Sequence, residues 1–127
     1  MLLREMMKPG EAKFGTFVVE FATPGIGYIL KNAGCDYAFL DLEHSGFSIE
    51  SLKSVLRYTE AAGLPSIIGL PSKDPHAISR VLDVGADGVI SPMVESAEEA
   101  RAAVARMKYA PNGARAVSAG VAHDRWG

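Results

Sequence analysis

The fold is decided by the stretch Tyr37-Ala38-Phe39-Leu40-Asp41-Leu42-Glu43-His44. Its first four residues are apolar and favour a buried strand. Three titratable side chains follow at the point where the apolar run ends. In parallel α/β folds the chemistry is done at the carboxyl ends of the strands. The stretch therefore predicts a strand of a parallel sheet with a candidate functional site at its end.

The sequence on both sides of this stretch alternates between strand and helix patterns. Strands are expected at residues 14–21, 37–42, 64–70 and 88–90. The helices between and after them are expected to begin at the capping residues Thr23, Ser48, Asp74 and Ser96, and to end near Asn32, Gly63, Gly85 and Met107. Alternating strands and helices imply a parallel sheet joined by right-handed crossovers.

Two α/β architectures fit four consecutive β/α units. One is the N-terminal half of a (β/α)₈ barrel, and the other is an open doubly wound sheet. A complete barrel typically needs about 250 residues, and this chain has 127. Four units would leave two sheet edges and one face uncovered, so we expect the chain to pair with itself or with another segment. We treat residues 1–127 as a single domain, with a tail at 109–127 that is mostly loop.

The composition of the chain indicates which binding partners and which cellular compartment to expect. The 13 basic and 15 acidic residues give a net charge of −2, which offers no electrostatic reason to expect nucleic acid or an anionic membrane as partner. A single cysteine cannot form an internal disulfide. No apolar run approaches the roughly 20 residues needed to span a bilayer. We therefore expect a cytoplasmic protein.

Spacing alone makes His44 the leading candidate for acid–base chemistry. Its unperturbed pKa lies near 6.5, so it can accept and donate a proton near neutral pH. The alternative is a loop histidine bonded to backbone. Strand alternation puts Asp41 and Glu43 on one side, although either could instead cap the helix near Ser48. Asp83 lies near the end of an apolar helical stripe, where it opposes the helix dipole; the alternative is an exposed aspartate.

Four motifs, in order, make the chain resemble a known family. They are GCDYAFLDLEH at 34–44, LDVGA at 82–86, SPMVESAEEA at 91–100 and YAPNGAR at 109–115. With them the chain resembles the HpcH/HpaI aldolases, metal-dependent 2-oxo acid aldolases that include 4-hydroxy-2-oxo-heptanedioate aldolase. The resemblance implies a (β/α)₈ barrel, a homo-oligomer, and cleavage of 4-hydroxy-2-oxo acids to pyruvate and an aldehyde. It also implies a divalent metal, Mg²⁺, Mn²⁺ or Co²⁺, acting as a Lewis acid.

The same resemblance assigns roles to particular residues. It implies that His44 acts in proton transfer and that Asp83 orients it. It places Glu43, Asp41 and Arg115 as candidate substrate-binding residues, Arg115 because it matches the arginine of a G-x-R-G motif. The substrate would be a small 2-oxo acid.

Two departures from the family pattern stand beside this assignment. The family has an arginine in the third strand, and this chain has Gly69 there. Losing one such donor costs about 10²–10³ in rate; Lys73 or Arg115 remain open as replacements. The family's acidic metal ligands lie on later strands, beyond Gly127, so we expect no metal ligand in this chain. These departures leave a second hypothesis, a non-catalytic half-barrel that acts as an oligomerising or structural module.

Overall fold

A parallel four-stranded sheet forms the centre of the molecule. The computed structural model describes residues 3–124. In chain order the elements are α1 (Leu3–Met6), β1 (Gly15–Val18), α2 (Ile26–Asn32), β2 (Tyr37–Asp41), α3 (Ile49–Ala61), β3 (Ser66–Gly69), α4 (Pro75–Asp83), β4 (Gly88–Ile90), α5 (Ala97–Met107) and the 3₁₀ turn η1 (Ala122–Asp124). The predicted alternation of strand and helix is confirmed.

The order of the strands distinguishes the two expected architectures. The strands lie in the order β1-β2-β3-β4, and every neighbouring pair is parallel. A doubly wound sheet reverses its strand order at a switch point, and this sheet does not. Consecutive order with parallel pairing is the arrangement of four successive units of a (β/α)₈ barrel, so the chain forms a half-barrel.

Three of the four predicted helix starts are capped as expected. The side chain of Ser48 accepts a hydrogen bond from the backbone N–H of Ser51, and the Ser51 hydroxyl oxygen accepts one from the backbone N–H of Ser48, which completes a capping box. Asp74 accepts from the N–H of His76, and Ser96 accepts from the N–H of Glu99. Each cap satisfies one N–H that the helix itself leaves unpaired.

The start of α2 and the length of β1 differ from the prediction. Gly25, not Thr23, is the N-cap of α2 and makes no side-chain cap. The carbonyl of Thr23 instead accepts from the N–H of Ile26, so a turn precedes the helix. A Cβ on Gly27 would lie 2.4 Å from the carbonyl oxygen of Tyr58, which shows why a glycine stands where α2 crosses α3. β1 is four residues long because the pairing with β2 covers only Gly15–Val18.

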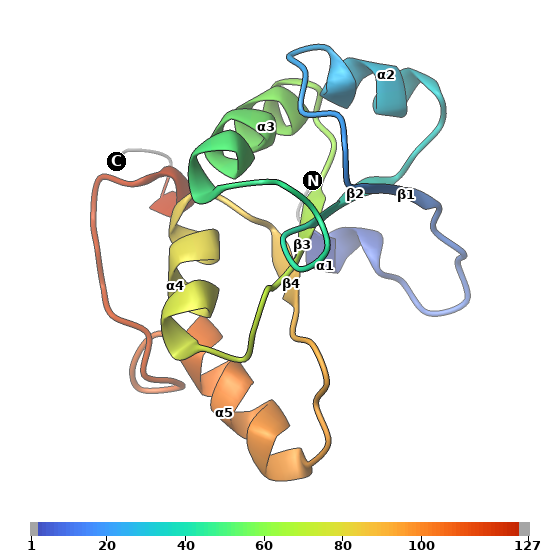
Figure 1. The fold of residues 1–127 in the computed structure, drawn as a ribbon. Helices are drawn as coiled ribbons and strands as arrows, with labels where there is room; N and C mark the ends of the chain where they lie inside the picture. The colour runs from blue at the N-terminus through green and yellow to red at the C-terminus, as the bar shows by residue number, and fades with distance from the viewer. Residues whose placement is uncertain (1–2, 125–127) are drawn as a thin grey trace.

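All the long helices cover one face of the sheet. The buried side chains of Val18, Leu40 and Ile68 point to this face and pack against residues of α3 and α4. Figure 1 shows α2 to α5 along one side of the strands and α1 on the other side. One hydrophobic core therefore lies between the sheet and its helices, as on the outer side of a barrel.

The opposite face of the sheet is only partly covered. Leu3 of α1 lies over Gly88, whose added Cβ would be 2.7 Å from the Leu3 side chain. Nearer the carboxyl ends of the strands, Phe17 and Ile90 are exposed apolar residues, and the ring of Phe17 stacks at 4.8 Å on that of Phe39. This face corresponds to the inside of a barrel. Among the described residues, no helix is long and apolar enough to cross a membrane.

Candidate functional site

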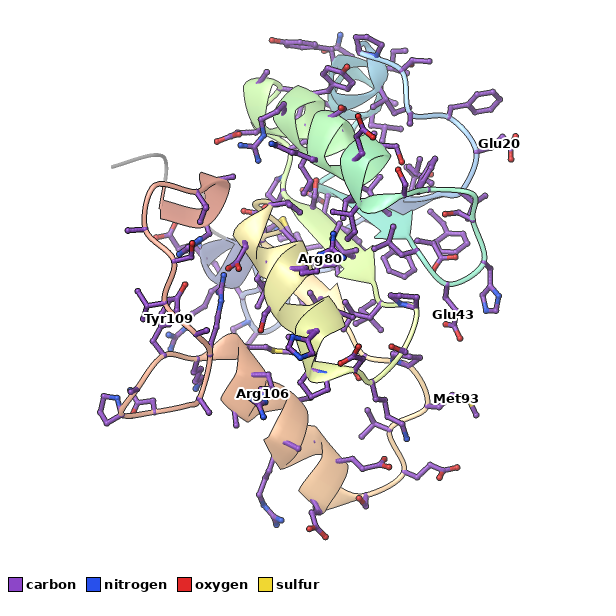
Figure 2. All side chains as sticks on the ribbon, turned by 60° about the vertical axis from the view of Figure 1, so that its left-hand side comes forward. Glu20, Glu43, Arg80, Met93, Arg106 and Tyr109 are labelled. Atoms are coloured by element: carbon purple, nitrogen blue, oxygen red, sulfur yellow. The ribbon has the colours of Figure 1, made fainter. Side chains whose placement is uncertain are left out.

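The carboxyl ends of β2, β3 and β4 meet at one edge of the sheet. Asp41, Gly69 and Ile90 are register partners across the three strands. Leu42 donates to the carbonyl of Gly69 and Leu70 to that of Ile90, so the pairing continues to the first loop residues. Figure 2 shows Glu20, Glu43 and Met93 on this same side of the molecule. We call this edge, with the loops that follow the strands, the mouth of the half-barrel.

Asp41 organises the loop that follows β2. It is almost fully buried, at 3% exposure. One carboxylate oxygen accepts from the N–H of Glu43 at 3.2 Å and the other from the N–H of His44 at 2.7 Å. Both oxygens are thus committed to loop backbone, which gives Asp41 a positioning role at the mouth. The sequence prediction of Asp41 as a substrate-binding residue stays a prediction.

Ser45 completes the same turn, a role that the sequence reading missed. Its hydroxyl donates to the carbonyl oxygen of Asp41 and accepts from the N–H of Phe47 at 3.1 Å. Ser48 then caps α3 directly afterwards. The loop is therefore fixed from the last strand residue to the first helical turn, by short-range side-chain bonds that serine and aspartate commonly make.

His44 extends from this fixed loop into solvent. Its side chain is 77% exposed, and Nε2 lies 3.7 Å from Oε2 of Glu43. The backbone N–H of His44 donates to Asp41, so the backbone is anchored while the ring stays accessible to solvent. An accessible imidazole beside a carboxylate can accept a proton from a bound molecule and return it.

Gly69 lies against Asp41, and its neighbours fill the space of a side chain. A Cβ there would be 2.8 Å from Oδ1 of Asp41 and 3.0 Å from the ring of Phe39. A Cβ contact shorter than 3.0 Å is essentially never observed, so a larger residue here would require the Asp41 carboxylate, which holds the His44 loop, to move. The third strand therefore presents no cation to the mouth.

Lys73 does not occupy the place of that missing cation. Its ammonium donates to the carbonyl of Met93 at 3.2 Å and to Glu99 at 2.9 Å. The other oxygen of Glu99 accepts from the N–H of Glu95. This last hydrogen bond, followed by the one from Lys73, lowers the pKa of the Glu99 carboxyl below its usual value. Lys73 thus joins the loops after β3 and β4.

Asp83 and Arg115 lie at the other end of the sheet from His44. Asp83 ends α4, and α4 runs back to the amino ends of the strands, where the N–H of Asp87 donates to the carbonyl of Ser66 at the start of β3. Nη2 of Arg115 donates to Oδ1 of Asp83 at 2.5 Å. Within this chain the structure does not bring Asp83 to His44, and Arg115 does not reach the mouth.

The Asp83–Arg115 pair explains an aspartate that opposes the dipole of its own helix. Arg115 is buried, with its side chain 6% exposed, and stacks at 4.9 Å on the ring of Tyr109. Tyr109 in turn bonds Nε2 of His123 at 2.7 Å, and Nδ1 of His123 lies 3.8 Å from Asp83. These side chains fasten the tail to α4, on the side of the molecule away from Glu43 (Figure 2).

The donor set at the mouth does not fit a divalent metal. Such an ion takes several carboxylate, imidazole or water ligands at once. Both oxygens of Asp41 already accept hydrogen bonds from backbone N–H groups, and Glu43 and His44 are the other titratable side chains of the same loop. Across residues 3–124, no group of three or more His, Cys, Asp or Glu side chains could hold a metal ion.

Comparison with known proteins connects this arrangement to a family of lyases. The family model described as HpcH/HpaI aldolase/citrate lyase matches residues 13–122. A 2-dehydro-3,6-dideoxy-6-sulfogluconate aldolase of Pseudomonas putida is 34% identical over 96% of this chain and 48% of its own length. A hydroxypyruvate/pyruvate aldolase of Roseovarius nubinhibens is 38% identical over 80% of this chain and 40% of its own length.

A solved structure agrees with the sequence comparison. The HpcH/HpaI aldolase from Desulfitobacterium hafniense DCB-2 superposes with a TM-score of 0.88 at 32% identity, over 94% of this chain and 46% of that one. The chain thus spans about half the length of the relatives it matches. These relatives are named as aldolases, which does not favour the non-catalytic alternative.

Proposed function

The chain belongs to the HpcH/HpaI aldolase/citrate lyase family. On that premise we propose that it is part of a carbon–carbon lyase and contributes the residue that transfers the proton. The proposed reaction is the cleavage of a 4-hydroxy-2-oxo acid to pyruvate and an aldehyde. The observation that supports it most directly is His44, an exposed imidazole on an anchored loop at the mouth. Its position is that of a catalytic residue in a β/α barrel.

In the proposed step His44 first accepts a proton and later donates it. The imidazole takes the proton of the 4-hydroxyl group, and the bond between C3 and C4 breaks. The oxygen electrons form the aldehyde carbonyl, while the C3–C4 electron pair becomes the enolate of pyruvate. The imidazolium then returns the proton to C3, which gives pyruvate and restores neutral His44. Oε2 of Glu43 lies 3.7 Å from Nε2 of His44, on the same loop.

The developing enolate charge needs a stabilising group that these residues do not supply. Gly69 carries no cation, and Lys73 is bonded to Glu99 and Met93. A missing donor of this kind costs about 10²–10³ in rate. We propose that a divalent metal, Mg²⁺, Mn²⁺ or Co²⁺, would act as the Lewis acid that provides this stabilisation, with ligands other than the described residues.

We also propose that the chain works in the cytoplasm as a homo-oligomer. Exposed Phe17 and Ile90 on the inner face, and the free edges of β1 and β4, favour association. Asp41 and Glu43 are the proposed substrate-side residues at the mouth, Asp41 through the loop it holds. Asp83 and Arg115, the other two predicted site residues, would act only by holding the tail to α4 unless a neighbouring copy brings them to a mouth.

The experiment is a pyruvate-release assay with the product of the natural gene. A panel of 4-hydroxy-2-oxo acids is tested with Mg²⁺, Mn²⁺ and Co²⁺ and with a chelator. We expect metal-dependent pyruvate and aldehyde in equal amounts. No turnover of any of these acids with any of the three metals would contradict the proposal.

A further inference from the structure

Met93 has an unusual backbone conformation in the loop after β4. Its φ angle is 49°, the left-handed region, and among the described residues it is the non-glycine residue with a positive φ. Non-glycine residues seldom adopt it, and those that do are enriched in Asn, Asp and His. Its side chain is also 75% exposed. A strained backbone that presents an apolar side chain to water points to a function rather than to packing.

Side chains from two other segments hold this conformation in place. Lys73 donates to the carbonyl of Met93, and Glu99 accepts from both Lys73 and the N–H of Glu95. Residues 93–95 are thus fixed at both ends by one ion pair. Without such restraint, a strained residue on a surface loop would relax to an ordinary conformation.

The sheet register places the loops that carry Met93 and His44 at the same edge of the sheet. Asp41 and Ile90 are both register partners of Gly69. His44 is three residues beyond Asp41, and Met93 is three residues beyond Ile90. The two strand ends are two strand spacings apart, about 10 Å. Figure 2 shows Met93 on the side of the molecule where Glu43, the neighbour of His44, also lies.

We propose that Met93 is a specificity-determining residue that contacts the carbon chain beyond C4 of the substrate, with Lys73 and Glu99 as its positioning residues. This inference rests on the proposed function, because His44 then takes the 4-hydroxyl proton and the chain beyond it extends across the mouth. The predicted substrate class is a 4-hydroxy-2-oxo acid with an unbranched apolar chain after C4. The flexible thioether of methionine suits such a chain.

The first test measures binding and does not depend on turnover. The chain is labelled with ¹³C at its methionine methyl groups, and the Met93 signal is assigned with Met93→Leu. Pyruvate and 2-oxooctanoate are the probes. The Met93 methyl is expected to shift with 2-oxooctanoate and not with pyruvate. The signal of Met7, an exposed methionine outside the mouth, is the control and is expected to stay. An unmoved Met93 signal with both acids overturns the proposal.

The second test measures selectivity. Met93→Ala is expected to lower the kcat/KM ratio of long-chain to short-chain substrates by about 10- to 200-fold, the range for apolar chain contacts. Met7→Ala should leave the ratio unchanged. Lys73→Met should lower the ratio in the same direction and Lys73→Arg should restore it, which a merely structural role would not do. An unchanged ratio in Met93→Ala overturns the proposal. Absence of turnover in every protein contradicts the lyase, and the methyl titration then decides on Met93.

Discussion

Arg115 is bonded to Asp83, with Nη2 and Oδ1 at 2.5 Å, although the two residues are 32 positions apart in the sequence. This contact closes the tail over α4. The cost of removing one partner depends on how buried the other is. The Arg115 side chain is 6% exposed and that of Asp83 is 30% exposed. A buried cation that loses its partner is costly, whereas a partly exposed carboxylate can be solvated.

The first prediction concerns the stability that this pair provides. Asp83→Ala is expected to lower the free energy of unfolding by about 2–3 kcal/mol, less than the 3–5 kcal/mol of a fully buried pair because Asp83 is partly solvated. Urea unfolding at neutral pH measures it. In the double variant with Arg115→Met, the loss should be smaller than the sum of the two single losses. Additive losses would show that the two residues are not coupled.

The second prediction concerns the turn that presents His44. Asp41→Ala removes the acceptor of two loop N–H groups, those of Glu43 and His44. A buried group left unpaired costs about 1–3 kcal/mol. Hydrogen exchange at these two amides should therefore accelerate strongly in Asp41→Ala and less in Asp41→Asn, which keeps one acceptor oxygen. Unchanged exchange at both amides would mean that the loop is held by other contacts.

The third prediction concerns Gly69. Gly69→Ala places a Cβ 2.8 Å from the Asp41 carboxylate and is expected to destabilise the chain by about 1–3 kcal/mol, as overpacking does. Gly69→Arg should be no more stable than Gly69→Ala. It should not raise the rate of pyruvate release to that expected with the family's arginine, because it displaces the carboxylate that anchors the His44 loop. Thermal unfolding and pyruvate release measure the two effects. A gain in rate with unchanged stability would refute this reading of the position.

The fourth prediction concerns the pH dependence of the Lys73–Glu99 ion pair, which holds residues 93–95. The hydrogen bond from the N–H of Glu95, with that from Lys73, lowers the pKa of Glu99. A carboxyl whose pKa is lower in the folded than in the unfolded protein stabilises the fold at pH values above its unfolded pKa, near 4.5. This contribution disappears as the pH falls through the folded pKa. Wild type should therefore exceed Glu99→Gln in urea midpoint at pH 7, and the difference should vanish in strong acid. A difference that persists there would exclude titration of Glu99 as its origin.

Local signals in the sequence predicted most of the fold. Ser48, Asp74 and Ser96 mark their helices because a capping residue acts on the backbone N–H groups next to it, a short-range effect that a sequence displays directly. Thr23 failed as a cap because its carbonyl closes a turn with the N–H of Ile26, so that α2 begins after Gly25. The close contact of Gly27 with Tyr58 joins residues far apart in the chain and leaves no local pattern.

The site divides in the same way. The place of His44 after β2 could be predicted, because the end of an apolar run is visible in the sequence. The partners of charged groups could not, since Asp83 meets Arg115 and Lys73 meets Glu99 only after the helices have packed. Ser45 and Met93 carry no signal of their own. The sequence around Ser45 does not distinguish it from other loop serines. The positive φ of Met93 accompanies its contact with Lys73 and the pairing of Lys73 with Glu99, residues that lie far from it in the sequence or on another element.

The most direct test of the central claim is the rate of pyruvate release by His44→Asn against the wild-type product of the natural gene, with equal folding checked by circular dichroism. Asparagine keeps the size and polarity of the side chain but cannot carry the proton. We predict a loss of about 10²–10⁴-fold in kcat, the usual contribution of a general acid–base group. A kcat within the error of wild type would contradict the account, because the proton would then be moved by another group.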